Sequence, residues 1–321
     1  MPYNLLLNSS NVINTDNTNF QYEFTNGSFT IEEGAEICIS QIVMPYSFFN
    51  LNKGLYDNTN FQFSLTFGVT TTNYSITLPN GFYSTTDINN YLEQYFITNG
   101  MYCTDNSTGN YVFFIYLYTN ITYYANQFIV SPIIPLNTAG YTFPINYINA
   151  STTTYGYTPT IIFPSTGGLN SILGFNAGSY PSTQSLTTQL NFISNATPNA
   201  TPINSIVVRT NLCNNDCSTP SDILDTFSLS GASFGSNIVY TPSYEKWINC
   251  SYGIFNSFFV YFQDQNLNRI QSNDPNVLIS LLLRQGTTNR EKALVKYQEQ
   301  IIQTQEEIKQ KINPIDFKDE L

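Results

Sequence analysis

Two apolar segments near the end of the chain, Ile254-Phe-Asn-Ser-Phe-Phe-Val-Tyr-Phe-Gln263 and Val277-Leu-Ile-Ser-Leu-Leu-Leu-Arg284, indicate its fold class. In the first segment, both alternating faces carry aromatic or aliphatic side chains, which is typical of a strand covered on both sides. In the second, one face holds only Val, Ile and Leu. The intervening residues 264–276 are rich in Asp, Asn and Pro, which favour turns. The two segments, within Phe234–Arg284, are therefore predicted to form the closing hairpin of an antiparallel sandwich.

The composition agrees with a mainly β protein that has an unusually uncharged surface. Aromatic residues make up 15% of the 321 residues and charged residues only 10%, a balance that favours strands over helices. The formal net charge of -11 argues against direct nucleic-acid binding, which needs Lys and Arg against phosphate. No basic residue occurs between Lys53 and Arg209. Such a surface is typical of a protein that packs against neighbours, because charge is depleted at interface cores.

The sequence offers little catalytic chemistry. Histidine, the commonest general base and metal ligand, is absent. No nucleophile elbow, phosphate-binding loop or dinucleotide fingerprint occurs. The segment Glu32–Glu36 groups three carboxylates at a turn and is interpreted as a solvated corner. We therefore predict a protein without enzymatic activity, cofactor or metal.

The cysteines do not form the pattern of a disulfide framework. There are five, an odd number, spread thinly over a long chain. Cys213 and Cys217 are close enough in sequence for a local bridge or for half of a metal site, and the sequence leaves their state open. A reduced, cytosolic type of compartment is the interpretation that this usage favours.

Nothing in the sequence predicts secretion or membrane insertion. The first seven residues lack the basic region of a signal peptide, and the longest apolar run, Val112–Tyr118, is too short to span a membrane. The last four residues, Lys318–Leu321, match an address for retention in the endoplasmic reticulum. We interpret that match as a coincidence in an acidic tail.

Strand-like segments occur before and after a stretch of different texture. Residues 1–19 are interpreted as an arm, followed by strands at 20–24, 29–31, 36–44 and 61–67. From 69 to 202 the chain is rich in Tyr, Thr and Asn, and a helix is predicted at 83–96 with Ser84 or Thr85 as its cap. Its apolar face would hold Ile88, Leu92 and Phe96. Strands resume at 204–210, 222–228 and 237–240.

Two sets of residues are candidates for contacts with other molecules. A helix is predicted from about Thr288 to Ile312, with an apolar stripe at heptad spacing that would pack on its own domain or on another chain. The stripe consists of Leu294, Tyr297, Ile301 and Ile308, with Thr304 between them. The central stretch also carries tyrosines that would form an outer contact surface or fill strands, namely Tyr123, Tyr124, Tyr141, Tyr147, Tyr155 and Tyr157.

Three motifs, in their order along the chain, resemble the penton (minor capsid) proteins of virophages and Polinton-like viruses. The first is Leu78-Pro-Asn-Gly-Phe-Tyr-Ser-Thr-Thr-Asp-Ile-Asn-Asn-Tyr-Leu92, and the second is Ile172-Leu-Gly-Phe175. The third is Tyr240-Thr-Pro, continuing through Trp247 into Phe258–Arg284. Each motif is short and none is catalytic, so the resemblance depends on their order over most of residues 20–285.

The resemblance implies a single jelly-roll β-sandwich with an outward-facing inserted domain. The change of texture at about 69 and its return at about 203 fit such an insertion, so 1–68 and 203–286 would form the jelly roll and 69–202 an insertion of mixed β and α structure. The C-terminal α-helix of the tail 287–321 is predicted from its own sequence pattern and departs from the family. The resemblance also implies a homopentamer at each five-fold vertex of an icosahedral virion, made in the host cytoplasm or a viral factory. The partners would be a double-jelly-roll major capsid protein and other minor capsid proteins. Two alternatives stay open: a cement protein between capsomers, and a host-attachment or glycan-binding module that works through the Tyr-rich insertion.

Overall fold

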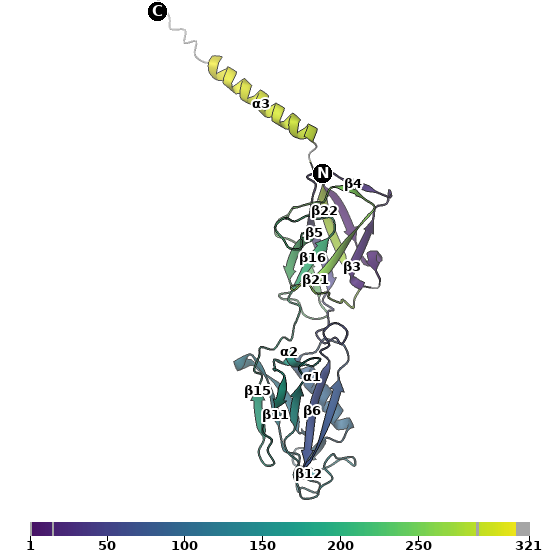
Figure 1. Ribbon diagram of the computed structural model, residues 1–321, viewed down its shortest axis with the longest axis vertical. Helices are drawn as coiled ribbons and strands as arrows, with labels where there is room; N and C mark the ends of the chain where they lie inside the picture. Colours follow the sequence, from purple (N-terminus) through teal and green to yellow (C-terminus); the bar gives the residue numbers. More distant parts are fainter. Residues whose placement is uncertain (1, 15, 287–288, 313–321) are drawn as a thin grey trace, which may run out of the picture. The chain divides into compact units, whose positions relative to one another are not determined.

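The strands of the computed structural model, which describes residues 2–14, 16–286 and 289–312, fall into two units (Figure 1). Met1–Tyr46 and Ser205–Leu321 form the jelly-roll unit, and Ser47–Asn204 form the insertion unit. The first boundary therefore lies at Tyr46 and not at 68, where the change of composition had placed it. The strand β6 (Asn60–Phe67), expected in the jelly roll, pairs instead with two strands of the insertion unit.

The jelly-roll unit is built from two antiparallel sheets. The first sheet has the order β1 (Tyr3–Leu7), β22 (Leu278–Arg284), β5 (Glu36–Pro45), β18 (Asn237–Tyr240), and β19 (Ile248–Asn249) also pairs with β5. The second has the order β17 (Ile223–Ser228), β16 (Ser205–Thr210), β21 (Ser257–Asp264), β3 (Asp16–Glu23), β2 (Val12–Ile13). A short ribbon joins β4 (Phe29–Ile31) to β20 (Gly253–Phe255), and η1 is Ser9–Asn11.

The order of the strands in these sheets confirms the predicted jelly roll. Among the described residues of the jelly-roll unit, eight main strands remain when the short strands β2, β4, β19 and β20 are set aside. Numbered along the chain, the first sheet has the order 1-8-3-6 and the second the order 2-7-4-5. This arrangement is a pair of interlocked Greek keys, which is the jelly-roll topology. The insertion unit follows the third of these strands, β5, and the chain returns in the fourth, β16.

Two expectations about this sandwich are wrong. β21 and β22 do not form a hairpin, because β21 pairs with β16 and β3 whereas β22 pairs with β1 and β5 in the opposite sheet. The connection between them crosses from one sheet to the other. Residues 1–19 are not an arm either, since β1 lies along β22 and buries Leu5 and Leu7.

The core of the jelly roll lies between the inner faces of the two sheets. β21 contributes Phe258, Val260 and Phe262, and β22 contributes Ile279, Leu281 and Leu283, all at most 2% exposed. Burial of each such side chain stabilises the fold by about 1.5–3 kcal/mol. The outer residues of β21 are half-buried, as the apolar character of both faces had suggested.

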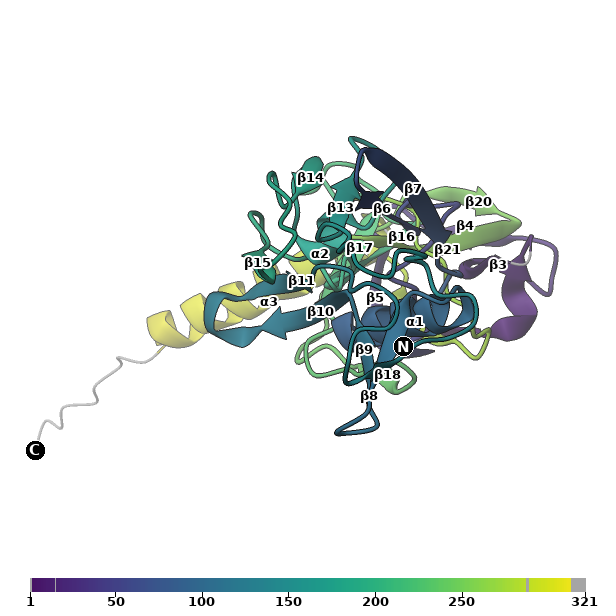
Figure 2. The same cartoon turned by 90° about the horizontal axis from the view of Figure 1, so that it is seen from below.

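The insertion unit contains three smaller sheets and two helices (Figure 2). The largest sheet has the order β14 (Gly178–Tyr180), β13 (Thr160–Phe163), β6, β7 (Thr70–Thr77). The others are β10 (Ile115–Asn120), β11 (Ala125–Val130), β15 (Leu190–Ile193), and β12 (Tyr141–Thr142), β8 (Tyr102–Asp105), β9 (Tyr111–Phe113). The two α-helices are α1 (Thr85–Thr98) and α2 (Asn170–Leu173), and η2 (Ile121–Tyr123) is a 3-10 turn.

An aromatic core joins these elements. Phe61 of β6 stacks on Phe128 of β11 at 5.9 Å between ring centroids, and Phe63 meets Phe96 of α1 edge-on at 5.7 Å. α1 begins as predicted, with Ser84 as its cap in a capping box with Asp87, and it buries Ile88, Leu92 and Phe96. The 3.6-residue spacing of the apolar side chains therefore identified both the helix and its buried face.

The two ends of the insertion unit are held together by one buried amide. Asn50, which is 1% exposed, donates from Nδ2 to the carbonyls of Tyr83 and Ala200, both at 2.8 Å. Its Oδ1 accepts from the backbone N–H of Tyr83 at 2.8 Å. Asn50 lies just after the start of the unit and Ala200 just before its end, so the entering and leaving segments lie side by side.

Candidate functional site

The four basic side chains of the jelly-roll unit that precede the C-terminal helix each pair with a carboxylate of the same unit. Arg209 pairs with Asp222 at 2.7 Å, and Lys246 pairs with Asp225 at 2.8 Å. The remaining two pairs are Arg269–Asp16 at 3.0 Å and Arg284–Glu36 at 2.5 Å. The sequence showed how few basic residues precede the C-terminal helix, but it did not show that these four would each find a carboxylate.

Arg209 is the centre of a polar cluster on the second sheet. Its Nε and Nη2 donate to the two oxygens of Asp222 at 2.9 and 2.8 Å, and its Nη1 donates to Gln263 Oε1 at 2.7 Å. The guanidinium also lies over the ring of Tyr261, 4.9 Å from the centroid. The hydroxyl of Tyr261 donates to Asp222 at 2.6 Å. Burial and this hydrogen bond raise the pKa of Tyr261 to about 12.

Two further clusters combine a cation, a carboxylate and an aromatic ring. Asp225 accepts from the Tyr240 hydroxyl at 2.5 Å and from Lys246 at 2.8 Å, and the hydrogen bond to Asp225 raises the pKa of Lys246. On the first sheet, the guanidinium of Arg284 lies 4.1 Å from the ring centroid of Trp247. These contacts tie loops to the sheets and engage the cations of Lys246 and Arg284 within the unit.

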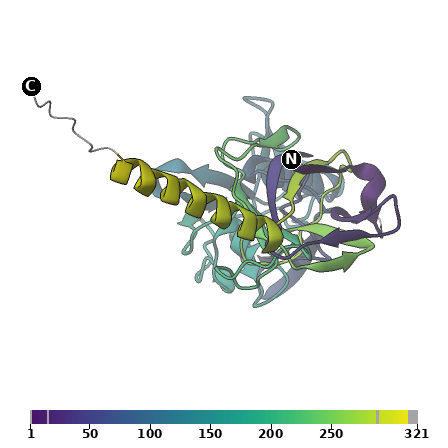
Figure 3. The same ribbon diagram turned by 90° about the horizontal axis from the view of Figure 1, so that it is seen from above.

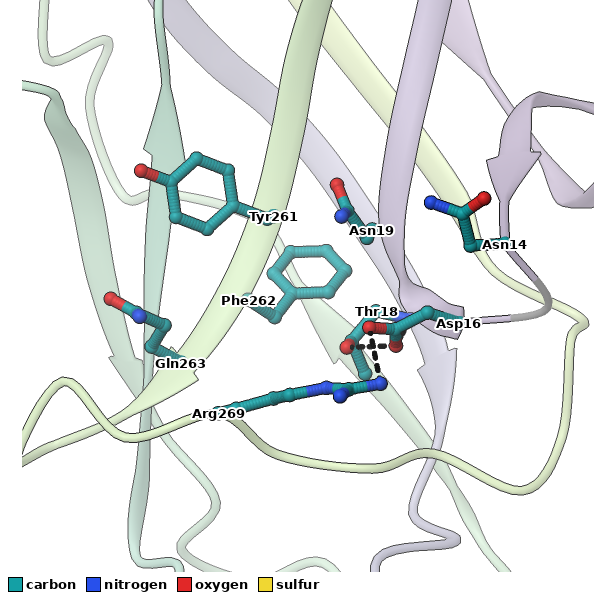
Figure 4. Close-up of a pocket in the computed structure, with 8 residues that line it drawn as sticks. All are labelled: Asn14, Asp16, Thr18, Asn19, Tyr261, Phe262, Gln263 and Arg269. Carbon is teal, nitrogen blue, oxygen red and sulfur yellow. Dashed lines mark hydrogen bonds and ion pairs between the residues drawn. The ribbon is translucent and has the colours of Figure 1, made fainter.

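An open hollow lies where Arg269 meets the second sheet (Figure 4). It has a volume of about 420 Å³ and is lined by Asn14, Asp16, Thr18, Asn19, Tyr261, Phe262, Gln263 and Arg269. One carboxylate oxygen of Asp16 accepts from the Thr18 hydroxyl at 2.6 Å, and the other pairs with Arg269. Both oxygens are therefore engaged, and Asp16 is poorly placed to act as a general base or a metal ligand.

An apolar row crosses the outer face of the first sheet. Cross-strand pairing places Val43 of β5 between Leu278 of β22 and Val239 of β18. Leu278 is 37% exposed and Val239 62% exposed, while their neighbours Ile42 and Ile279 point into the core. We call Leu278, Val43 and Val239 the apolar row. Leu6 of the adjoining strand β1 is also exposed, at 49%.

A second exposed apolar surface lies at the tip of the β10–β11 hairpin in the insertion unit. Ile121, Tyr123 and Tyr124 are 86%, 68% and 76% exposed, and we call them the hairpin tip. Tyr124 adopts a left-handed backbone conformation with φ of 48°, which is uncommon for a bulky residue. Ile121 and Tyr124 border a cavity of about 480 Å³ whose other walls include Asn126 and Asn199.

The structure separates the six candidate tyrosines. Tyr123 and Tyr124 share the hairpin tip, Tyr155 is 41% exposed, and Tyr141 and Tyr157 are half-buried. The expectation of exposure is wrong for Tyr147, which is only 8% exposed. Its hydroxyl donates to the carbonyl of Ile134 at 2.7 Å, and burial raises its pKa above the ordinary value. The six residues are therefore not one surface.

The C-terminal helix α3 (Asn289–Ile312) forms where the heptad pattern predicted it (Figure 3). Tyr297, Ile301 and Ile308 of the apolar stripe are 66%, 45% and 49% exposed. The side chain of Leu294 lies outside the described residues. The described part of the stripe is therefore uncovered in the single chain, and its role as an interface stays a prediction.

All five cysteines are free thiols, with Cys217 exposed and the other four buried. No bridge joins Cys213 to Cys217, which was one of the possibilities that the sequence left open. Within residues 2–14, 16–286 and 289–312, no group of three or more Cys, Asp or Glu side chains is arranged to hold a metal ion. Over the same described ranges, no helix is long and apolar enough to cross a membrane.

Comparisons with known proteins find similarity at the level of three-dimensional structure. No protein-family model matches the chain, and no curated protein matches it. Among solved structures, the chain is similar to the crystal structure of the selenomethionine-labelled penton protein of mavirus. The two chains are 11% identical with a TM-score of 0.43, and the match covers 88% of this chain and 97% of the mavirus chain.

Proposed function

We propose that this protein is a structural capsid protein, a penton that forms the pentameric capsomer at the five-fold vertices of an icosahedral virion. The observation that carries the proposal is the complete jelly-roll strand order, interrupted after its third strand by a separately packed insertion. The same chain carries three motifs in the order that resembles virophage and Polinton-like pentons. Its partners would be further copies of itself, a double-jelly-roll major capsid protein and other minor capsid proteins, all within the virion.

The apolar row gives the jelly roll a surface suited to contact between copies. Val239 and Leu278 expose apolar area on a regular sheet face, and exposed apolar patches commonly mark protein contacts. The four ion pairs of the unit matter here as well. Because each of these four cations is already matched with a carboxylate, a neighbouring copy could pack against the sheets without burying one of them unpaired, which would be costly.

The experiment compares Val239→Glu with Val69→Glu in particles assembled with the major capsid protein. Val69 is fully exposed in the insertion unit, so it is a matched control for adding a carboxylate. We expect Val239→Glu to weaken incorporation by about 100-fold or more, since an unpaired buried charge costs about 3–5 kcal/mol. Val69→Glu should assemble normally. A reconstruction of the particle that places the protein away from the five-fold vertices, for example between capsomers as a cement protein, would overturn the penton assignment.

A second candidate function, attachment to a host glycan, is favoured by the hairpin tip. An exposed tyrosine ring beside the exposed amide of Asn199 suits a neutral sugar, which stacks its apolar face on an aromatic ring and accepts hydrogen bonds from an amide. The insertion unit holds only Lys53 and four carboxylates as charged residues, which favours an uncharged ligand. Tyr124→Ala should abolish binding on a glycan array, whereas Tyr111→Ala, at a 50% exposed tyrosine on β9, should not. Absence of glycan binding by the wild-type chain would exclude this role.

A further inference from the structure

Two buried cysteines from separate connections of the jelly-roll unit are paired across an antiparallel bridge. Cys213 follows β16, and Cys250 follows β19. Two backbone hydrogen bonds flank the pair, from Asn214 N–H to the Asn249 carbonyl and from Ser251 N–H to the Leu212 carbonyl, both at 2.8 Å. Cys213 and Cys250 exchange no backbone hydrogen bond with each other. They are therefore a non-hydrogen-bonded pair of an antiparallel ladder.

This position brings two cysteines within reach of a covalent bond. In a non-hydrogen-bonded pair the Cα atoms are about 4.5 Å apart and the side chains leave the same face of the ladder. Disulfides form between residues whose Cα atoms are about 4.4–6.8 Å apart. We propose that Cys213 and Cys250 are a disulfide-forming pair, which closes when the folded chain meets an oxidising small-molecule disulfide such as glutathione disulfide.

The reaction is a thiol–disulfide exchange that balances without a further reagent. The two thiols each lose a proton and together lose two electrons as the bond between the two Sγ atoms forms. The bond in glutathione disulfide breaks and takes up those electrons and protons, which gives two molecules of glutathione. Because the thiolate is the attacking species, burial has a kinetic effect: it raises the pKa of Cys213 and of Cys250 to about 12. The pair should therefore oxidise slowly.

A bridge at this position would fasten three segments at one end of the sandwich. Cys213 lies in the connection from β16 to β17, where its thiol lies 3.6 Å from the carbonyl of Ser221. Cys250 lies in the connection from β18 to β21, and its N–H donates to the carbonyl of Ala35 at 2.8 Å, immediately before β5 begins. The disulfide would close a loop of several dozen residues, which restricts the unfolded chain. This inference does not depend on the capsid role.

The test uses the full-length protein and peptide mapping. The folded chain is equilibrated with excess glutathione disulfide, remaining thiols are blocked after denaturation, and the protein is digested with trypsin. Cleavage after Arg209, Lys246 and Arg269 separates the peptide with Cys213 and Cys217 from the peptide with Cys250. We expect a disulfide that joins the two peptides, both in the wild type and in Cys217→Ser. Cys38 and Cys103, each buried in another part of the chain, should stay free.

Thermal unfolding gives an independent readout. The oxidised chain should unfold at a midpoint about 5–10 °C higher than the reduced chain, and Cys250→Ser should lose that difference. Three results would overturn the proposal: a bridge confined to the peptide that holds Cys213 and Cys217, a bridge that disappears in Cys217→Ser, or thiols of Cys213 and Cys250 that both remain free at equilibrium.

Discussion

Replacing Asp222 by Asn is expected to destabilise the jelly-roll unit more than any exposed ion pair could. Asp222 accepts three charge-assisted or phenolic hydrogen bonds, two from Arg209 and one from Tyr261. Arg209 is only 16% exposed, so the substitution leaves a largely buried cation with a neutral partner. Loss of one member of a fully buried pair costs about 3–5 kcal/mol. Because Asp222 itself is 25% exposed, water replaces part of the loss, and we expect about 2–3 kcal/mol.

The chain offers a convenient signal for this measurement. Trp247 is the sole tryptophan of the sequence and belongs to the jelly-roll unit, so its fluorescence reports the unfolding of that unit. In urea, the transition midpoint should fall with an unchanged slope, and the thermal midpoint should fall by about 4–12 °C. Arg269→Gln is the control, because Arg269 is 67% exposed in its pair with Asp16 and should cost less than about 1 kcal/mol. An equal loss of unfolding free energy in Asp222→Asn and Arg269→Gln would refute the reasoning, because it would show that water forms the hydrogen bonds of Arg209 once Asp222 is replaced.

Three further perturbations test other parts of the structure. Ser84→Ala should lower the free energy of unfolding by about 1 kcal/mol. Hydrogen bonds from Ser84 lower the pKa of Asp87, so the stability that the capping box contributes is present above about pH 4 and is lost in stronger acid. The free energy of unfolding of Ser84→Ala should therefore change less with pH in that range than that of the wild type. Burial raises the pKa of Tyr261 to about 12, so the contribution of Tyr261 to stability should be complete below about pH 10 and be lost between pH 10 and 12. Tyr261→Phe should therefore reduce the alkaline loss of stability of the jelly-roll unit, measured by urea unfolding with Trp247 fluorescence. Deleting Thr288–Leu321 should leave the thermal midpoint unchanged but reduce incorporation into particles, and a lowered midpoint would show that the helix packs on its own unit.

The strands could be predicted from the sequence wherever alternation was long enough to see. In β22 and β5 the apolar residues recur over most of a strand, and α1 shows a complete helical period with a cap. β1 was missed because only Leu5 and Leu7 carry its pattern, and its partner β22 lies at the other end of the chain. The pattern of neighbouring residues cannot reveal that two strands so far apart in the sequence pair with each other.

The boundary of the insertion and the candidate surfaces were harder for the same reason. The alternation of β6 suits a strand of either unit, and its pairing with β7 and β13 places it in the insertion. Tyr147 lies in a loop rich in polar residues, which gave no sign that its ring is buried. Its hydroxyl is satisfied by the carbonyl of Ile134, a partner that only the folded structure reveals. The partners of Arg209 and Arg284 are likewise set by tertiary structure, because opposite charges this sparse carry no spacing that a sequence pattern can identify.

The amide of Asn50 has a consequence for the order in which the chain folds. During synthesis β1 and β5 of the first sheet emerge early, but β22, the strand that lies between them, is the last strand to be made. Such long-range pairing is slow, because the intervening chain loses conformational entropy before the contacts that offset this loss can form. The insertion is complete much earlier, and once folded it holds its two ends together through Asn50. The folded insertion then joins β5 to β16 as a short loop would, which lowers the entropy lost when the jelly-roll strands pair. A chain with Asn50→Ala should therefore refold more slowly, and it should aggregate more readily before β22 pairs with β5.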